Sequence, residues 1–328
     1  MFTISQIEKL LKNSSSKLKI IFPEGEEEKI INVANQIAAS DFAIPVLVFR
    51  KAKEIKSNLH KNVEIKIIEN YDLEAMANNL FNLRNGKTSL ETAMSLVVEP
   101  NYFATMLLEL GEVDSLVCGL KYSTADTLRP ALQIIKTKPE YQFACSSIIM
   151  SKNDLQVLFA DCSLNVSPDS AQLAKIAKMN AEFAKTLGEP DPQVAMLSYS
   201  TLGSGKGLEV EKVAEAVRIL KTDQVDFNFG GEIQFDAAFS AEVRQKKAPD
   251  LKFSKQPNVF IFPDLNSGNI GYKIAQRMGD YVAAGPFILG LNKPVNDLSR
   301  GATLLDVYNT AIITLFQALA NKEEHLCT

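Results

Sequence analysis

The chain has 328 residues, of which 46% are hydrophobic and 23% charged, and its formal net charge is −4. This length is about twice the roughly 150 residues of a common domain, and the composition is that of an ordinary globular protein, so two domains are expected and disorder is excluded. The weak acidic balance supplies no basic surface for nucleic acid, so an anionic substrate would need a local cluster of arginines.

Histidine and cysteine usage narrows the possible chemistry. The two histidines, His60 and His325, stand in charged stretches typical of solvated surface, so proton transfer is expected from carboxylates, lysines, tyrosines or cysteines. The four cysteines are scattered without a CxxC pair, which indicates neither a zinc site nor a disulfide framework and favours a reduced cytoplasm. They are Cys118, Cys145, Cys162 and Cys327.

No targeting or membrane segment is expected. The N-terminal stretch MFTISQIEKLLKNSSSK mixes charged with apolar residues and lacks a cleavage site. The longest apolar stretch, residues 311–320, is interrupted by Thr314 and Gln317 and is shorter than the roughly 20 residues that a membrane helix requires. We therefore expect a cytoplasmic protein that does not enter a membrane.

Short apolar runs in the first half of the chain alternate with amphipathic stretches. Buried strands are predicted at residues 18–22, 44–49, 63–68 and 115–119. Residues 26–38 place Ile30, Ile31, Ala34 and Ile37 on one helical stripe, and glutamates occupy the first turn, where the helix dipole favours them. A strand followed by a helix is therefore expected at the start of the first domain.

The second half of the chain repeats this alternation. Strands are predicted at residues 155–161, 194–200, 225–229 and 259–264, with helical segments between them. Such alternation is typical of a largely parallel sheet covered on both faces, and the fold class is α/β. The rhythm of elements places the domain boundary near residue 143. Ligands of open α/β sheets gather at loops beyond the carboxyl ends of strands, where the segments discussed next lie.

The segment GLKYSTADTLRPALQIIKTKP, residues 119–139, follows a predicted strand and opens a helix. Ser123 and Asp126 have the spacing of a capping box, which is the simplest interpretation. Arg129 follows within two turns, and a guanidinium beside hydroxyl and amide donors also suits a doubly charged oxyanion. These residues fit both interpretations, a plain helix cap and a phosphate-binding site.

The glycine-rich turn TLGSGKG, residues 201–207, follows another predicted strand. It matches neither the Walker A pattern nor GxGxxG, so a plain loop is favoured over a nucleotide site. Further along, Glu232, Asp236, Asp264 and Asn269 lie near strand ends. Such side chains bind metals or cap helices; without histidine partners or an EF-hand spacing, a metal is the less favoured of the two.

The segment NKPVNDLSRGATLLDVYNTAIITLFQALA brings a serine, an arginine and an aspartate to one predicted helix start. Ser299 and Arg300 precede Gly301, and the helix is predicted to begin near Thr303. Asp306 is expected on a different face from the buried stripe of that helix. The stripe consists of Leu304, Leu305, Tyr308, Ile312, Leu315 and Phe316. A capped, solvated helix start and a reactive cluster both fit this spacing.

Six segments together resemble the phosphate acetyltransferase family, in the same order and over about residues 2–320. They are FPEGEEEKI, STADTLRPALQIIKTKP, ADCSLNVSPDSAQLA, GEIQFDAAF, FPDLNSGNIGYKIAQR and GLNKPVNDLSRGATLLDVYNTA. The chain is similar to the short form of the family, without extra N-terminal domains. One departure is Tyr122, which stands before STAD where many relatives have a histidine.

The resemblance implies two open α/β domains related to the isocitrate and isopropylmalate dehydrogenases. It implies a discontinuous first domain of residues 1–143 plus 300–328, a second domain of residues 144–299, an active-site cleft between them and a homodimer. The implied activity is the reversible transfer of an acetyl group between coenzyme A and inorganic phosphate, in acetate metabolism. Coenzyme A would be a substrate, and neither a metal nor another cofactor would take part.

The resemblance also implies roles for individual residues. Asp306 would be the general base, Ser299 would hydrogen-bond the acetyl carbonyl, and Arg300 would stabilise negative charge beside the reacting atoms. The substrate-binding residues would be Arg129, Thr124, Ser123 and, with a looser local match, Arg84. Cys162 resembles a cysteine that borders the site without acting as a nucleophile.

Three alternatives to this function remain. A related acyltransferase would take butyryl or another short chain, because pocket volume distinguishes one methylene by only about 1 to 3 kcal/mol. A metal- and NAD(P)-dependent decarboxylating dehydrogenase would have similar architecture, but the dinucleotide fingerprint is absent. A non-catalytic acetyl-CoA sensing module is disfavoured by intact Ser299, Arg300 and Asp306.

Overall fold

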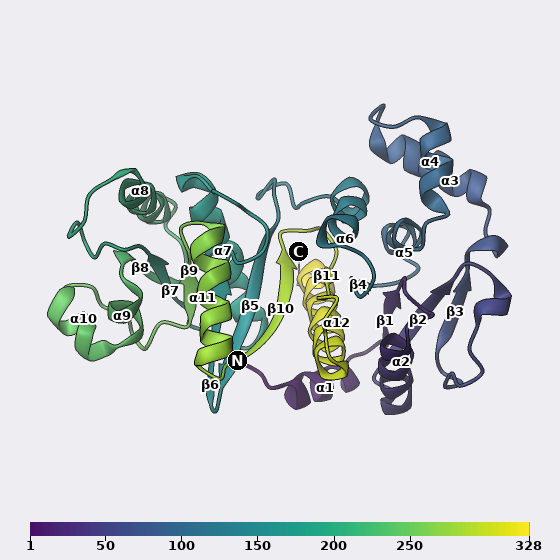
Figure 1. Ribbon diagram of the computed structural model, residues 1–328, viewed down its shortest axis with the longest axis horizontal. Coiled ribbons are helices and arrows are strands. Elements are labelled where there is room, and N and C mark those ends of the chain that lie inside the picture. Colours follow the sequence, from purple (N-terminus) through teal and green to yellow (C-terminus); the bar gives the residue numbers. More distant parts are fainter. Residues whose placement is uncertain (328) are drawn as a thin grey trace. The chain divides into compact units, whose positions relative to one another are not determined.

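The computed structural model describes the backbone of residues 1–327 and the side chains of residues 1–323 (Figure 1). The side chains of His325 and Cys327 lie outside the described part. The chain forms two compact units. We call residues 3–142 with 291–328 the N-terminal unit, and residues 143–290 with 1–2 the central unit.

The N-terminal unit contains a five-stranded, wholly parallel sheet in the order β11-β4-β1-β2-β3. Its strands are β1 (Leu18–Phe22), β2 (Ala43–Phe49), β3 (Glu64–Ile67), β4 (Ser115–Cys118) and β11 (Val295–Asp297). Its helices are α1 (Ile4–Lys12), α2 (Glu28–Ser40), α3 (Leu73–Arg84), α4 (Leu90–Val97), α5 (Pro100–Glu109), α6 (Thr124–Pro130) and α12 (Leu304–Cys327), with short turns η1 (Ala52–Glu54), η2 (Ile68–Asn70) and η3 (Ala131–Ile135).

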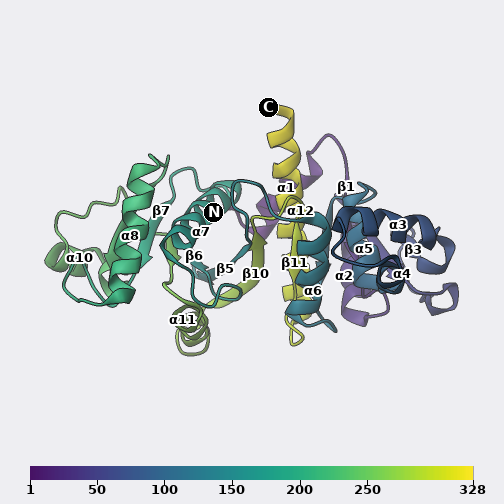
Figure 2. The same cartoon turned by 90° about the horizontal axis from the view of Figure 1, so that it is seen from above.

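Both faces of this sheet are covered, as the continuous apolar strands predict. Helices α2 and α12 pack together on one side, and α5 packs on the other (Figure 2). Burial of all nine residues from Pro100 to Leu108 shows how completely α5 is enclosed. The carboxyl ends of β1, β4 and β11 therefore share one edge of the sheet, and the loops that follow them carry the candidate site.

The central unit contains a six-stranded mixed sheet in the order β10-β5-β6-β9-β7-β8. Its strands are β5 (Cys145–Lys152), β6 (Leu155–Ala160), β7 (Gln193–Leu197), β8 (Asn228–Ile233), β9 (Val259–Ile261) and β10 (Val282–Leu289). Its helices are α7 (Ser170–Thr186), α8 (Leu208–Thr222), α9 (Phe235–Phe239), α10 (Ala241–Lys247) and α11 (Leu265–Met278). Strand β5 is antiparallel to both neighbours, so this sheet is not uniformly parallel.

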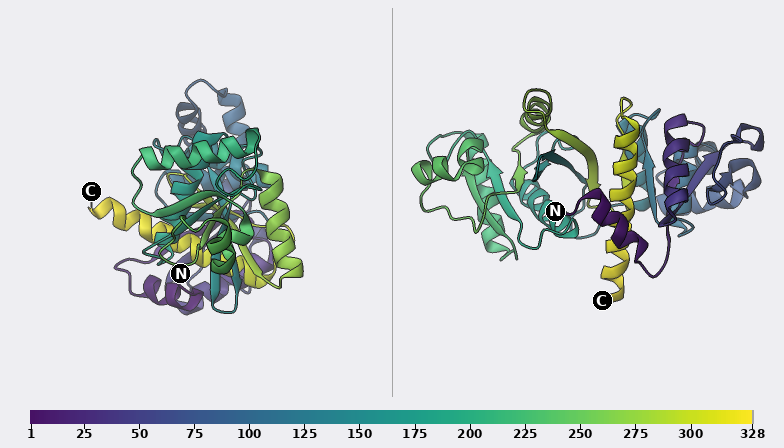
Figure 3. Two further views of the ribbon diagram at one scale, coloured as in Figure 1. Left: turned by 90° about the vertical axis from the view of Figure 1, so that its left-hand side faces the viewer. Right: turned by 90° about the horizontal axis from the view of Figure 1, so that it is seen from below.

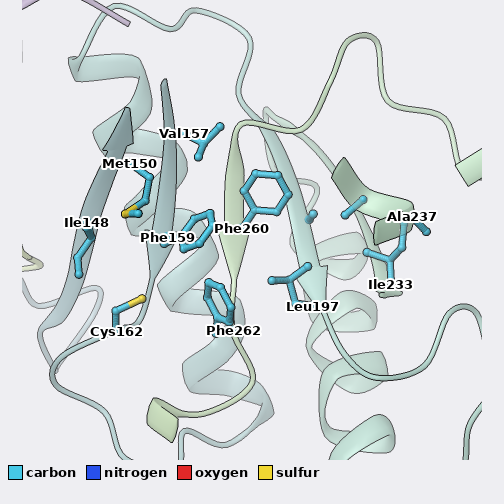
Figure 4. Close-up of a cluster of buried hydrophobic side chains, with 12 residues drawn as sticks. Ile148, Met150, Val157, Phe159, Cys162, Leu197, Ile233, Ala237, Phe260 and Phe262 are labelled. Atoms are coloured by element: carbon cyan, nitrogen blue, oxygen red, sulfur yellow. The ribbon is translucent and has the colours of Figure 1, made fainter. Parts of the chain in front are cut away.

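Helices cover the central sheet on both faces (Figure 3). Helix α7 packs on β5, β6, β7, β9 and β10, with α8 beside it. The opposite face carries a cluster built from Phe159, Phe260 and Phe262 with aliphatic neighbours, capped by Tyr272 and Ala275 of α11 (Figure 4). Cys162 belongs to this cluster and is fully buried.

All eight predicted strands have a counterpart, although the run predicted at 225–229 begins only at Asn228. Strands β5, β10 and β11 were not predicted from the sequence. The chain enters the central unit after Gln142 and returns at Leu291, earlier than the expected residue 300. The return is early because β11 pairs in parallel with β4, with Asn296 opposite Val117, and so belongs to the N-terminal sheet.

Candidate active site

The loop between β11 and α12 carries Ser299 and Arg300, and both side chains are exposed. The Ser299 hydroxyl oxygen accepts a hydrogen bond from the Gly301 amide at 3.3 Å. The backbone continues in a turn in which the Ala302 amide donates to the Ser299 carbonyl at 2.8 Å. Since the hydroxyl oxygen acts as acceptor in this turn, its hydrogen remains available to a substrate oxygen.

Asp306 lies in the first turn of α12 and takes part in its cap. Its Oδ2 accepts from the amide and the hydroxyl of Thr303, both at 2.8 Å, and the Asp306 amide donates back to Thr303 Oγ1 at 3.2 Å. This is a reciprocal cap of the kind that fixes a helix start. Among the described residues, Oδ1 accepts no hydrogen bond, so one carboxylate oxygen is held in place and the other is left for chemistry.

The predicted buried stripe of α12 is partly wrong. Tyr308, Ile312, Leu315 and Phe316 are buried, whereas Leu304 and Leu305 are 43% and 63% exposed. The helix begins at Leu304, its first turn is exposed at these two positions, and the buried stripe starts at Val307. Leu304 and Leu305 therefore border the same exposed helix start as Asp306.

The start of α6 holds the predicted phosphate contacts. Ser123 is the N-cap: its hydroxyl oxygen accepts from the Asp126 amide at 3.2 Å, and its hydroxyl donates to Asp126 Oδ2 at 2.6 Å. The Arg129 guanidinium donates to Asp126 Oδ1 at 3.2 Å and remains more than half exposed. The hydrogen bond from Ser123 lowers the pKa of Asp126, with a smaller effect from the Arg129 charge. Helix cap and exposed guanidinium are thus both present.

Tyr102 on α5 connects Arg129 electrostatically with Arg84, the last residue of α3. Burial raises the pKa of Tyr102, while the positive charges of Arg129 and Arg84 oppose that rise. Both guanidinium groups therefore act on one phenol, whose hydroxyl donates to Gln133 at 3.0 Å. Two cations consequently lie near Tyr102, beside α5 and α6.

Glu24 was not predicted as a site residue, although it lies in the segment FPEGEEEKI. Its carboxylate, 4% exposed, accepts four backbone N–H groups from the loop between β4 and α6. Gly119 and Leu120 donate to Oε2 at 2.9 and 3.2 Å, and the next two residues donate to Oε1 at 2.5 and 3.4 Å. The shape of the loop that leads into Ser123 therefore depends on a buried carboxylate more than 90 residues earlier.

Asp297, at the end of β11, was also missed. It is 3% exposed, and its Oδ2 accepts from the Thr124 hydroxyl at 2.6 Å. Gly119 makes room for it: with φ of +126°, an added Cβ there would lie 2.5 Å from Asp297 Oδ1. An aspartate in the segment PVND, two residues before Ser299, was the signal available in the sequence.

Tyr122, the departure from the family pattern, lines a cavity of about 130 Å³ at the carboxyl ends of β1, β2 and β4. Arg50 and Lys121 contribute cations to its wall, and Glu24 and Glu26 contribute carboxylates. Both cations are already paired, Arg50 with Glu99 at 2.7 Å and Lys121 with Glu26 at 2.6 Å. Burial raises the pKa of the Tyr122 phenol, so it stays protonated in the physiological range.

In the central unit, Cys162 follows a second buried carboxylate. Asp161 is 2% exposed and accepts from the Ser146 hydroxyl and from the amides of the next loop, Ser163 at 2.9 Å and Asn165 at 3.1 Å. Cys162 itself has no exposed surface, and burial raises the pKa of its thiol well above the usual value. A neutral, enclosed thiol is a poor nucleophile.

The other carboxylates at strand ends cap helices, pair with lysine or hold a turn. Asp264 caps α11 through the Ser267 amide at 2.8 Å, and Asp236 pairs with Lys247 at 2.7 Å. Glu232, 5% exposed, accepts from the Ser200 hydroxyl at 2.9 Å and the Gly203 amide at 2.6 Å, which fixes the glycine-rich turn. Asn269 donates to the Cys162 carbonyl at 3.0 Å. Within the described side chains, no group of three or more His, Cys, Asp or Glu residues is arranged to hold a metal ion.

Comparison with known proteins places these residues in a family context. The family model for phosphate acetyl/butaryl transferases matches residues 2–315. The chain belongs to this family. The phosphate acetyltransferase of Mycoplasma capricolum is 48% identical over 319 residues, covering 96% of this chain and 99% of that protein. The phosphate acetyltransferase of Bacillus subtilis is 46% identical over 315 residues, covering 94% and 97%.

The family fold is shown by a solved structure as well. A phosphotransacetylase from Streptococcus pyogenes is 42% identical and superposes with a TM-score of 0.91, covering 97% of this chain and 100% of that one. The expected dehydrogenase-like α/β fold class is confirmed by this match. In the described part of the chain, no helix combines the length and the apolar character needed to span a bilayer.

Proposed function

We propose that this protein is a phosphate acetyltransferase, which catalyses the reaction of acetyl-CoA with phosphate to give coenzyme A and acetyl phosphate, and its reverse. The observation that carries the proposal is the family match over residues 2–315 together with Ser299, Arg300 and Asp306 on one loop and helix start. The decisive assay follows free thiol released from acetyl-CoA by the purified protein. Release that depends on added phosphate supports the proposal, and release without phosphate, or none, contradicts it.

In the proposed mechanism, the coenzyme A thiol attacks the acetyl carbonyl of acetyl phosphate directly, in a ternary complex. Asp306 accepts the thiol proton on the carboxylate oxygen that its cap leaves available, and Arg300 stabilises the thiolate by its charge. The carbon–sulfur bond forms, the carbon–oxygen bond to phosphate breaks, and phosphate leaves with the electron pair. No covalent enzyme intermediate is needed.

Ser299 is assigned the role of stabilising the transition state. As the thiolate adds, charge develops on the acetyl oxygen, and a hydroxyl hydrogen aimed there favours the transition state over the bound substrate. The Gly301 amide already donates to the Ser299 oxygen, which orients the hydroxyl. Coenzyme A acts as a substrate in this scheme, and we propose that neither a metal nor another cofactor takes part; undiminished activity in a strong chelator tests that point.

The acyl chain length is the main alternative within the family, whose description covers both acetyl and butyryl transfer. We propose acetyl because the two curated relatives above are phosphate acetyltransferases over nearly their whole length. Competition among acetyl-, propionyl- and butyryl-CoA measures the preference. A higher kcat/KM for butyryl-CoA would overturn the acetyl assignment while preserving the reaction class.

Two further parts of the proposal concern the protein in its cell. We infer a homodimer and a cytoplasmic location from the family resemblance. Light scattering of the purified protein tests the dimer: a mass of one chain at micromolar concentration would contradict it.

Arg129→Ala is expected to raise the KM for acetyl phosphate about tenfold or more, with little change in the KM for coenzyme A. The reason is that a charge-assisted hydrogen bond to a phosphoryl oxygen is worth about 1.5 to 3 kcal/mol, and about 1.4 kcal/mol corresponds to tenfold. Arg218→Ala is the matched control, since Arg218 is also exposed and also pairs with a carboxylate three residues earlier. Equal losses for both substrates would indicate a structural arginine.

Cys162→Ala is expected to keep turnover within a few-fold of the wild type. The thiol lies in the apolar cluster of the central unit, so the change removes packing and costs about 1 kcal/mol of stability. Steady-state kinetics and chemical unfolding measure the two effects, with Cys145→Ala as a second buried cysteine for comparison. A loss of several orders of magnitude in turnover would require an acetyl-enzyme route through this sulfur.

A further inference from the structure

Asp297 is a buried carboxylate whose surroundings provide little to stabilise its charge. Oδ2 accepts one hydrogen bond, from Thr124 Oγ1 at 2.6 Å. Oδ1 has no hydrogen-bond partner among the described residues and faces the bare Cα of Gly119. No lysine or arginine of the described chain forms an ion pair with it. A charge enclosed in this way is unfavourable for folding unless it is neutralised.

The titratable groups around Asp297 are few. Glu24, on the loop after β1, acts directly on Asp297, and Cys118 on β4 is acted on by the charges of Glu24, Asp297 and Asp126. On the side of α12, the adjacent Asn296 side chain donates to the neutral side chains of Thr314 and Gln317, at 2.8 and 2.6 Å. Burial raises the pKa of Asp297 to about 6; the Thr124 and Thr127 hydroxyls and the Leu298 amide oppose that rise, and the Glu24 charge adds to it.

An asparagine at position 297 would have nearly the same size and could still accept from Thr124. The ionisable side chain is therefore unnecessary for packing, and its charge is unfavourable in this place. Its direct neighbour is Thr124, the first residue of α6 and one of the proposed phosphate contacts. A hydroxyl has a single hydrogen, so the state of Asp297 decides what Thr124 can offer to a ligand.

We propose that Asp297 is a positioning residue that controls the hydrogen-bonding role of Thr124 toward the phosphoryl group; this inference rests on the proposed function. When Asp297 is ionised, it takes the Thr124 hydrogen, and Thr124 can only accept from the substrate. When Asp297 is protonated, it donates to the Thr124 oxygen, and the Thr124 hydrogen is released for a phosphoryl oxygen. The negative charge behind Thr124 disappears at the same time, so anion binding is tighter in the protonated form.

The test compares the KM for acetyl phosphate in wild type and Asp297→Asn between pH 5 and 7.5. The wild-type KM is expected to rise severalfold relative to that of the variant as pH increases, because only the wild type gains the charge. The substrate's own titration is common to both proteins and cancels in their ratio. Asp41→Asn is the control, since Asp41 is exposed and pairs with Lys17 at 2.6 Å; its ratio to wild type should stay flat.

Thr124→Val tests the route of the effect, because it removes the hydroxyl through which Asp297 acts. In the Thr124→Val background, the effect of Asp297→Asn on the pH dependence of the KM should be much smaller, because only the repulsion between the Asp297 charge and the anion remains. A KM ratio of wild type to Asp297→Asn that is constant across this pH range would overturn the inference. So would a ratio that changes with pH as strongly in the Thr124→Val background as in the wild-type background.

A measurement without turnover separates this inference from the proposed function. The raised pKa means that protonated Asp297 contributes stability at low pH that is lost as pH rises through about 6. Asp297→Asn should therefore melt several degrees above wild type at pH 8 and close to it at pH 4.5.

Added inorganic phosphate should raise Tm more for the variant than for wild type at pH 7.5. Equal melting at both pH values, or equal phosphate shifts, would refute the role of Asp297 even if acetyl transfer were confirmed; absence of acetyl transfer alone would refute only the proposed function.

Discussion

Asp306→Asn is expected to lower turnover by roughly 10² to 10⁴ at neutral pH while substrate KM values change little. The amide is close in size and can still accept from the Thr303 amide and hydroxyl, so the helix start is preserved while the proton acceptor is removed. Raising the pH should restore part of the rate, because a larger share of coenzyme A, a thiol with an ordinary pKa of about 8.5, then arrives as thiolate. The pH profile of kcat measures this recovery.

Two controls make the Asp306 result specific. Thr303→Ala removes the cap but keeps the carboxylate, so its effect on turnover should be much smaller than that of Asp306→Asn. Ser299→Ala should lower turnover without recovery at high pH, because it removes a contact to the acetyl oxygen and no proton acceptor. Near-normal activity of Asp306→Asn at neutral pH would place the base elsewhere, even with the overall reaction confirmed.

Glu24→Ala is expected to destabilise the protein by about 3 to 5 kcal/mol and to abolish most activity. The change leaves four backbone donors of the loop at residues 119–122 without their acceptor, and each unsatisfied buried donor costs about 1 to 3 kcal/mol before water enters. The loop leads directly into Ser123 and Thr124, so its displacement should also raise the KM for acetyl phosphate. Urea unfolding and steady-state kinetics measure the two consequences.

Glu26→Ala is the matched control for Glu24. It removes a carboxylate from the same segment, but Glu26 is more than half exposed and pairs with exposed Lys121, so a change of at most about 1 kcal/mol is expected. Glu24→Gln should fall between the two, since one amide oxygen replaces two carboxylate acceptors. Equal unfolding free energies for Glu24→Ala and Glu26→Ala would show that the loop does not depend on this carboxylate.

The repeating strands and helices were predictable because buried parallel strands are continuous apolar runs. LKIIF, for example, is predicted and observed at residues 18–22. Strand β5 was missed because Ser146 and Ser147 interrupt its apolar character, although both are fully buried. Strand β10 was missed because it is half-exposed over much of its length and contains Gly285 and Pro286. Strand β11 has only three residues, too few for periodicity to indicate anything.

The site was predictable where its members are neighbours in sequence and unpredictable where they are not. Ser123 and Asp126 form the predicted capping pair, and Ser299, Arg300 and Asp306 lie on one short segment. The residues beneath them act across long separations. Glu24 binds amides more than 90 residues away, and Asp297 accepts from Thr124 across 173 residues. The spacing of residues within one segment carries no information about such partners, because they come together only through the order of the strands in the sheet.

Two loops in the described part of the chain direct several successive amides at one carboxylate, Glu24 from another segment and Asp161 from the loop's own start. Successive amides that converge in this way form the concave arrangement with which many proteins bind anions. Here each concavity already contains a carboxylate of the protein itself. The loops therefore keep their shape without a ligand, and their amides are not available to compete for one. Recognition of a charged substrate is left to projecting side chains, whose identity can change without reshaping the backbone that carries them.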